Sequence, residues 1–259
     1  MNIPQAFHNP ISISLRCALA ALLAAVAMGL TAPAAEAPKI KVLLVTGDDV
    51  FPPHNWKEVS QATRKILEDS GKFAVKVCED PAVLDSAAAL QRYDLVYLAM
   101  YNATTPTLSD LSKANLAGFV KGGKGFVVSH LSSASFKEWP EFKQLCGRNW
   151  VMGTSGHGPR APFKVKIADD SHPITKGLAG FEADDELYAK LQGDTPIKVL
   201  LEADSDWSHN TEPLAFVLTY GTGRVFHETL GHDARALTNP TLQQVIVRGC
   251  EWVATGAVK

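Results

Sequence analysis

Short apolar runs alternate with segments of helical spacing through the first half of the chain. The runs 40–46, 93–100 and 125–129 are near-continuous, as is typical of strands buried on both faces of a parallel sheet. Between them, residues 56–70 and 108–120 carry apolar side chains at helical spacing and are followed by glycines. Helices of this length connect parallel strands by right-handed crossovers, so we predict a mainly parallel sheet covered on both faces.

The second half of the chain is richer in predicted strands. Strand patterns occur there at 163–167, 197–203, 214–219 and 223–230, in addition to one at 73–78 in the first half. A last helix is predicted over 240–254, with Asn239 as its N-cap and Pro240 at its first position. No low-complexity linker or internal repeat interrupts this order. We therefore predict one doubly wound α/β domain over residues 38–259.

The first 37 residues differ from the rest in composition. Arg16 precedes an apolar run over 17–30, which is too short to span a bilayer but suits the hydrophobic region of a secretory signal. Ala35 and Ala37 fit an A-x-A cleavage site. The pattern predicts a periplasmic or extracellular protein that begins near Pro38 and keeps no stable membrane span. An uncleaved N-terminal anchor is the alternative.

Charge and cysteine content exclude several classes of partner and site. With 25 Lys+Arg against 27 Asp+Glu, the net charge of -2 gives no broad attraction to nucleic acid or anionic lipid. Beyond residue 37 the cysteines are Cys78, Cys146 and Cys250, without a C-x-x-C pair, which argues against a thiolate zinc site. Two interpretations of them stay open: one disulfide, or three small buried side chains.

Three histidines follow predicted strands. His54 comes after the first strand, His130 follows the strand 125–129, and His232 follows the last strand. In a doubly wound sheet, ligands bind beyond the carboxyl ends of the strands, so we expect these imidazoles to share one site. Imidazole exchanges protons near neutral pH and, in its neutral form, binds metals.

Further candidate residues lie near the same strand ends or in loops. His157 stands between glycines, which let a backbone approach a ligand closely. Of the adjacent pair Asp185 and Glu186, we assign Glu186 to catalysis with His130 and His232, and Asp185 to substrate binding beside His54, His157, Trp56 and Tyr101. The remaining histidines of the domain are interpreted as structural or solvated: His172, His209 and His227.

Several strings in the sequence resemble the ThuA-like (trehalose utilisation) family. They are His54-Asn55-Trp56, the segments 122–130 and 139–142, Gly147, and the segments 172–178, 185–188 and 223–233. The set spans nearly all of residues 40–256. The resemblance implies a fold similar to class I glutamine amidotransferase-like and flavodoxin-related proteins. It also implies a role in the metabolism of trehalose-type disaccharides and their 3-keto derivatives.

The chain departs from the amidotransferases at the position of their nucleophile. Those enzymes carry a cysteine on a sharp turn after a central strand, and the corresponding stretch 127–131 contains none. Ser129 is not surrounded by a Gly-x-Ser-x-Gly elbow. Both thiolate and serine chemistry are therefore disfavoured.

Two mechanisms remain open for a histidine-rich site. In the first, His130, His232 and Glu186 transfer protons on a sugar whose carbonyl acidifies the neighbouring carbon, which gives isomerisation, elimination or hydrolysis by way of elimination. In the second, His54, His130 and His232 are candidate ligands of a divalent metal that assists the reaction. The sequence contains no H-E-x-x-H motif that would favour the metal.

A non-catalytic sugar-binding protein is the alternative function. Its aromatic side chains would stack on sugar rings, with these candidates: Trp56, Tyr101, Trp139, Trp150 and Trp207. A third interpretation, a partner-binding protein, predicts an exposed apolar patch. An enzyme instead requires two or more titratable groups in contact, with displaced pKa values. The oligomeric state stays open.

Overall fold

The computed structural model describes Met1 and residues 39–48, 54–102 and 108–259. The predicted signal peptide lies outside these residues except for Met1, and so do the short segments 49–53 and 103–107. Residues Lys39–Lys259 group as one unit. No helix within the described residues has both the length and the apolar character needed to cross a membrane.

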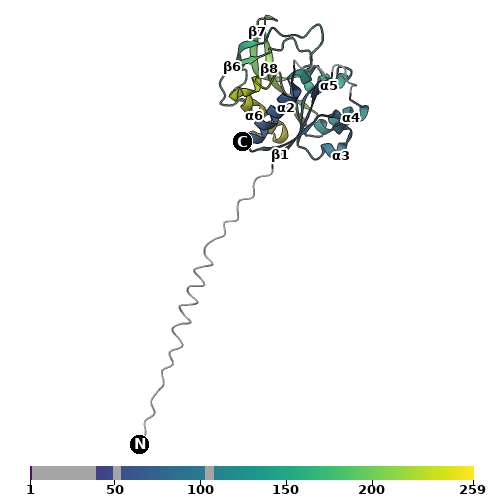
Figure 1. Ribbon diagram of the computed structural model, residues 1–259, viewed down its shortest axis with the longest axis vertical. Coiled ribbons are helices and arrows are strands. Elements are labelled where there is room, and N and C mark those ends of the chain that lie inside the picture. The colour runs from purple at the N-terminus through teal and green to yellow at the C-terminus, as the bar shows by residue number, and fades with distance from the viewer. Residues whose placement is uncertain (2–38, 49–53, 103–107) are drawn as a thin grey trace. The chain divides into compact units, whose positions relative to one another are not determined.

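A nine-stranded sheet forms the centre of this unit (Figure 1). Its strands are β1 (Ile40–Asp48), β2 (Phe73–Cys78), β3 (Leu95–Tyr101), β4 (Gly125–Ser129), β5 (Ala161–Ile167), β6 (Phe181–Asp185), β7 (Lys198–Ser205), β8 (Asn210–Tyr220) and β9 (Gly223–Glu228). Their order in the sheet is β2-β1-β3-β4-β9-β8-β7-β5-β6. The neighbours from β2 to β9 pair in parallel, and those from β9 to β6 pair antiparallel.

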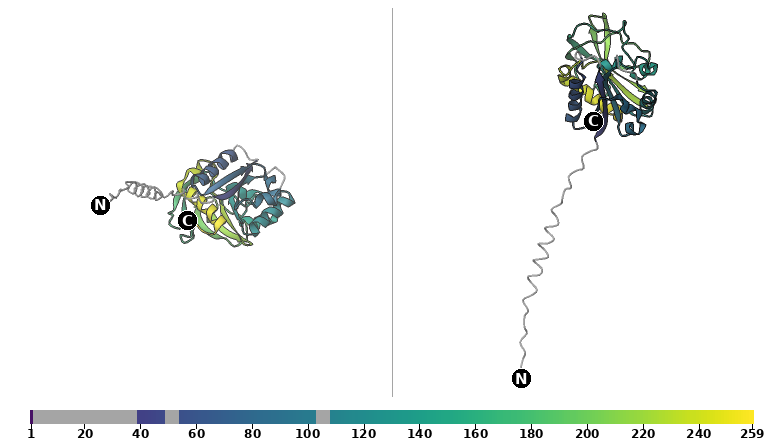
Figure 2. Two further views of the ribbon diagram at one scale, coloured as in Figure 1. Left: turned by 90° about the horizontal axis from the view of Figure 1, so that it is seen from below. Right: turned by 45° about the vertical axis from the view of Figure 1, so that its right-hand side comes forward.

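Helices cover both faces of the parallel part (Figure 1, Figure 2). They are α2 (Trp56–Asp69), α3 (Ala87–Leu90), α4 (Asp110–Lys121), α5 (Pro140–Cys146) and α6 (Pro240–Thr255), with short 3-10 helices η2 (Pro81–Asp85), η3 (His130–Ala134) and η4 (Ala236–Thr238). Successive side chains of a strand point to opposite faces. Val42 and Leu44 of β1 therefore pack with α2 and α6, whereas Leu43 and Val45 pack with α4 and α5.

The predicted mixed α/β fold is confirmed, but the mainly parallel sheet describes only half of the strand pairings. The antiparallel half begins where β8 pairs with β9. Only two residues, Gly221 and Thr222, connect these strands. A connection this short permits only an antiparallel hairpin, since a parallel crossover needs a dozen residues or more. Strand β6 and helix α5 were not predicted. The predicted N-cap Asn239 is present, and its side chain accepts hydrogen bonds from two backbone N–H groups of α6.

All three cysteines of the described domain are free thiols. Cys146 and Cys250 are buried, and Cys78 is half-buried on β2. Burial raises the pKa of Cys146 to about 12. Of the two interpretations, the structure therefore favours free thiols over a disulfide, and the buried Cys146 is not a thiolate nucleophile.

Candidate functional site

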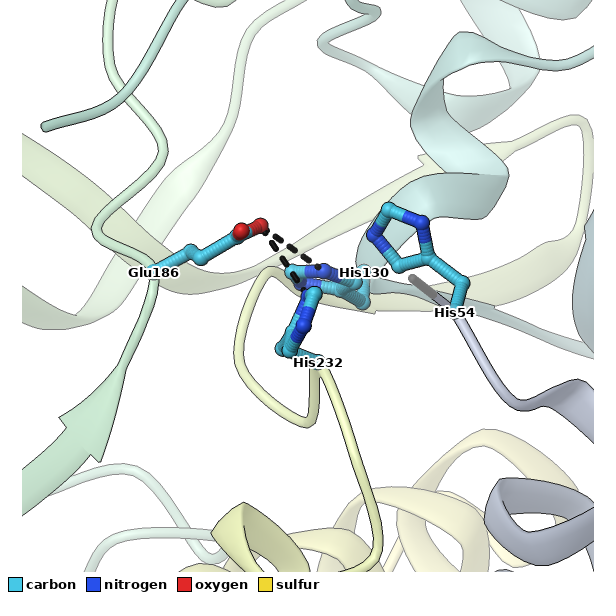
Figure 3. Close-up of side chains that lie close together, drawn as sticks. All are labelled: His54, His130, Glu186 and His232. Atoms are coloured by element: carbon cyan, nitrogen blue, oxygen red, sulfur yellow. Dashed lines mark ion pairs between the residues drawn. The ribbon is translucent and has the colours of Figure 1, made fainter. Parts of the chain in front are cut away.

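Four side chains converge at one edge of the sheet (Figure 3). His130 directly follows β4, His232 follows β9, Glu186 follows β6, and His54 lies just before α2. One potential ligand atom from each lies within 4.8 Å of the others. The expected meeting of three histidines is thus present, and Glu186 joins them. We call these residues the His₃Glu cluster.

His130 is held in one orientation by hydrogen bonds at both ring nitrogens. Its Nδ1 lies 2.7 Å from the carbonyl oxygen of Thr229, and its Nε2 lies 2.9 Å from the hydroxyl of Tyr188. Because a carbonyl oxygen only accepts hydrogen bonds, Nδ1 carries the proton. The lone pair of the neutral ring is then on Nε2, which faces Glu186 at 3.6 Å.

The backbone of His130 is strained. Its φ of 44° lies in the left-handed region, which is disfavoured for residues other than glycine because of their Cβ atom. His130 is the first residue of η3 and directly follows β4, so the sharp turn places the imidazole at the end of the strand. Strain at such a position is common in functional sites.

We therefore expect a His130→Gly variant to be more stable than His130→Ala by about 1 kcal/mol. Both substitutions remove the imidazole, but only glycine adopts the positive φ without a clash of Cβ. Urea unfolding of the two variants measures the difference. Equal free energies of unfolding would show that the turn is not strained.

Glu186 provides the negative charge of the cluster. Its Oε2 lies 3.2 Å from His232 Nδ1, 3.6 Å from His130 Nε2 and 3.7 Å from His157 Nε2. Burial alone would raise the pKa of this carboxyl, but the close approach of His130 and His232 outweighs burial and holds the pKa well below its usual range. Glu186 is therefore a carboxylate at neutral pH.

The imidazoles of His54 and His232 are shifted in opposite directions. Burial, together with the neighbouring His130 and His232, lowers the pKa of His54 to about 4. Contact with Glu186 raises the pKa of His232. His54 is therefore neutral near pH 7, whereas His232 gains a proton more readily than an isolated imidazole.

Asp185 was predicted to contact the substrate, but in the structure its carboxylate binds backbone N–H groups. It is buried, and its carboxylate accepts hydrogen bonds from the backbone N–H groups of Glu186, Gly231 and His232 at 2.8, 2.6 and 3.2 Å. Neighbouring residues at the end of a strand point to opposite sides, which turns Glu186 into the cluster and Asp185 away from it. Asp185 ties the end of β6 to the loop after β9.

The other predicted contacts lie around the cluster at different depths. The side chain of His157 is 33% exposed, and its Nδ1 lies 2.7 Å from the carbonyl oxygen of Gly158. Trp56 and His54 line a cavity of about 30 Å³ that also reaches His130 and His232. Tyr101 is half-buried at the end of β3, at the same edge of the sheet.

The loop that carries His157 is fixed through Gly156. This glycine forms a two-way backbone bridge with Ala189, and the indole of Trp207 packs against it. A Cβ at Gly156 would lie 2.5 Å from the Trp207 ring, so a larger residue there would displace the indole. Trp207 thereby holds the loop beside the cluster.

Two residues near the cluster were not predicted. Tyr188, which is buried, contacts His130, and the only pointer to it was its place in the string 185–188. Glu228 is fully buried in β9, where burial raises its pKa to about 8. It accepts a hydrogen bond of 2.5 Å from Ser129. This bond gives Ser129 a structural partner and further disfavours serine chemistry.

The three remaining histidines of the domain have no place in the cluster. His227 is fully buried and its Nδ1 lies 2.9 Å from the carbonyl oxygen of Cys146. His172 is buried against Trp252. His209 is exposed in the turn between β7 and β8. These positions agree with the structural and solvated interpretations.

Known proteins share both sequence and structure with this chain. The profile of the ThuA family, described as trehalose utilisation, matches residues 41–253. A putative ThuA-like protein from Parabacteroides merdae ATCC 43184 is 29% identical, with a TM-score of 0.74 over 86% of this chain and 92% of that chain. A putative ThuA-like protein from Bacteroides uniformis ATCC 8492 is 19% identical, with a TM-score of 0.70 over 88% and 98% of the two chains. A search of curated proteins gives no significant match.

Proposed function

Because the chain belongs to the ThuA, or trehalose utilisation, family, we propose that it is an exported enzyme acting on trehalose-type disaccharides or their 3-keto derivatives. The observation that carries the proposal is the Glu186 carboxylate, which lies within 3.7 Å of three imidazole nitrogens. Export rests on the apolar run over 17–30 and the A-x-A pattern after it.

The pKa values in the cluster favour an enzyme over a sugar-binding module. Glu186, His54 and His232 are in one cluster, and their pKa values are displaced in different directions. Groups driven apart in this way serve as acids and bases at one pH. Of the aromatic candidates for sugar stacking, Trp139 is buried between Phe136 and Phe142 and is not available.

The reaction that suits these groups is proton transfer next to a ketone. A base removes the proton from the carbon between the carbonyl and the anomeric carbon, and the electron pair of that bond forms an enolate. When the enolate collapses, a double bond forms to the anomeric carbon and the glycosidic carbon–oxygen bond breaks. The departing oxygen leaves with the bonding pair and takes up a proton, so no oxidant or reductant is needed. Each positioned acid or base contributes about a hundred- to ten-thousandfold to such a step.

The strand order supports a flavodoxin-like fold, which is part of the same proposal. The parallel strands are arranged β2-β1-β3-β4-β9, which matches the 2-1-3-4-5 order of flavodoxin-like sheets. In that order the direction of winding reverses beside β1 and β3. His54 follows β1, so part of the cluster lies at this switch point.

The test is turnover of 3-keto-trehalose compared with trehalose, followed by ¹H NMR in D₂O. We expect the keto sugar to be consumed and to exchange the proton next to its carbonyl, whereas trehalose stays intact because that carbon is not acidified. Binding of either sugar without consumption would contradict the enzyme and support the binding protein.

A further inference from the structure

We propose that His54, His130, Glu186 and His232 bind one divalent transition-metal ion, Zn²⁺ or a first-row neighbour. The catalytic use of this ion rests on the proposed function, but its binding does not. The assignment also changes the roles predicted for three of these residues: His130, Glu186 and His232 act as ligands and leave the transfer of the substrate proton to another group.

The first argument is the number of buried polar atoms without a partner in the cluster. Both ring nitrogens of His54, the Oε2 of Glu186 and the Nδ1 of His232 are buried and make no hydrogen bond. A buried polar atom without a partner is costly, and native proteins contain few of them. Here they occur together, on side chains that offer lone pairs to one point. A single cation would satisfy one ring nitrogen of His54 together with Glu186 Oε2 and His232 Nδ1.

The second argument is the spacing of the donor atoms. Glu186 Oε2 lies 3.2 Å from His232 Nδ1 and 3.6 Å from His130 Nε2. Tetrahedral bonds of about 2.0–2.1 Å to zinc separate neighbouring ligand atoms by about 3.3 Å. The two distances lie on either side of that value. Neither contact is a hydrogen bond in this structure: Glu186 Oε2 and His232 Nδ1 have no hydrogen-bond partner, and His130 is hydrogen-bonded to Thr229 and Tyr188 instead.

The third argument is the support given to the ligands from behind. His130 Nδ1 donates to the carbonyl oxygen of Thr229, which directs the Nε2 lone pair into the cluster. Asp185 fixes the backbones of Glu186 and His232 together. Metal-binding histidines and carboxylates are held by such outer hydrogen bonds. The Tyr188 hydroxyl, 2.9 Å from His130 Nε2, must give up this bond when the ion binds.

The donor set determines the kind of ion. Three imidazoles and one carboxylate suit Zn²⁺, Fe²⁺ or Ni²⁺ better than Ca²⁺ or Mg²⁺, which prefer oxygen ligands. The adjoining cavity of about 30 Å³, lined by His54, His130 and His232, has room for about one water. Because zinc can expand from four to five ligands, one exchangeable group can join the four side chains here, and the carbonyl oxygen of a keto sugar has the chemistry to do so. The ion would supply polarisation of that carbonyl.

This assignment leaves His157 as the nearest imidazole outside the ligand set. Its Nδ1 donates to the carbonyl oxygen of Gly158, so the neutral ring has its lone pair on Nε2. That atom faces Glu186 at 3.7 Å, and a third of the side chain is exposed. His157 is thus accessible to a substrate bound over the cluster, and it is the group we expect to exchange the substrate proton.

The test is metal binding by the full-length protein after removal of metals with a chelator. We expect one Zn²⁺ per chain by elemental analysis, a rise in Tm on adding Zn²⁺, and a visible absorption spectrum of imidazole-bound Co²⁺. His54→Asn and Glu186→Gln should each weaken Zn²⁺ binding at least about a hundredfold, because each removes a ligand. Circular dichroism of the metal-free variants checks that both fold.

The matched control is His209→Asn, which changes an exposed histidine outside the cluster and should bind Zn²⁺ as the wild type does. Failure of the wild type to bind Zn²⁺ or Co²⁺ stoichiometrically overturns the metal site. An equal loss of binding in His209→Asn and His54→Asn overturns it as well. Stoichiometric binding without turnover of 3-keto-trehalose supports the site and contradicts the proposed function instead.

Discussion

Replacing Glu186 by glutamine is expected to lower kcat for 3-keto-trehalose about a thousandfold. The substitution preserves the size of the side chain but removes the Glu186 carboxylate, which faces His130, His157 and His232. The loss acts on both mechanisms, since the carboxylate is needed either as a metal ligand or as the partner of the imidazoles. Steady-state kinetics with the keto sugar measure the effect.

The control for this variant lies on the adjoining strand. Glu182→Gln neutralises an exposed carboxylate of β6 and should leave kcat within about twofold, because it lies at the surface. A Glu186→Gln enzyme with more than a tenth of wild-type kcat would remove Glu186 from the catalytic site. Unaltered circular dichroism excludes misfolding as the cause of a loss.

Replacing Asp185 by alanine is expected to lower the free energy of unfolding by at least about 3 kcal/mol and to abolish turnover. The substitution leaves the backbone N–H groups of Glu186, Gly231 and His232 without their acceptor in a buried place. It also releases the loop after β9 from the end of β6. Urea unfolding measures the first effect and kinetics the second.

Asparagine at the same position separates the two roles of Asp185. Asp185→Asn keeps one accepting oxygen, so its loss of stability should be smaller than that of the alanine variant. Asp206→Asn, at an exposed carboxylate, should change stability by less than about 0.5 kcal/mol. A stable and active Asp185→Ala protein would mean that the two loops hold their positions without this carboxylate.

Much of the parallel half and part of the site were predictable because both follow local rules. Near-continuous apolar runs marked β1, β3 and β4, and the strand-end rule led to His130 and His232. For the antiparallel half, the direction of strand pairing and the presence of β6 were harder to predict. Strand β6 contains Glu182, Asp184 and Asp185, so its sequence lacks the apolar run that indicates a buried strand.

The remaining parts of the site depend on depth and orientation, which a pattern of residue types does not contain. Asp185 and Glu186 are adjacent carboxylates, and only the direction of their side chains decides which one enters the cluster. Tyr188 gains its place because the chain after β6 pairs with Gly156 through Ala189. The left-handed backbone of His130 is likewise a tertiary feature that a histidine does not predict.

The division of the sheet has a consequence for how this chemistry can vary. His54, His130 and His232 belong to loops of the parallel half, whereas Glu186 follows the outermost strand of the antiparallel half. His157 lies just before β5, in the same half. Substitutions at Glu186 and His157 can therefore change the anion and the exposed imidazole, while the three histidines keep their places on the parallel half. Reactivity and scaffold can thus diversify separately within one chain.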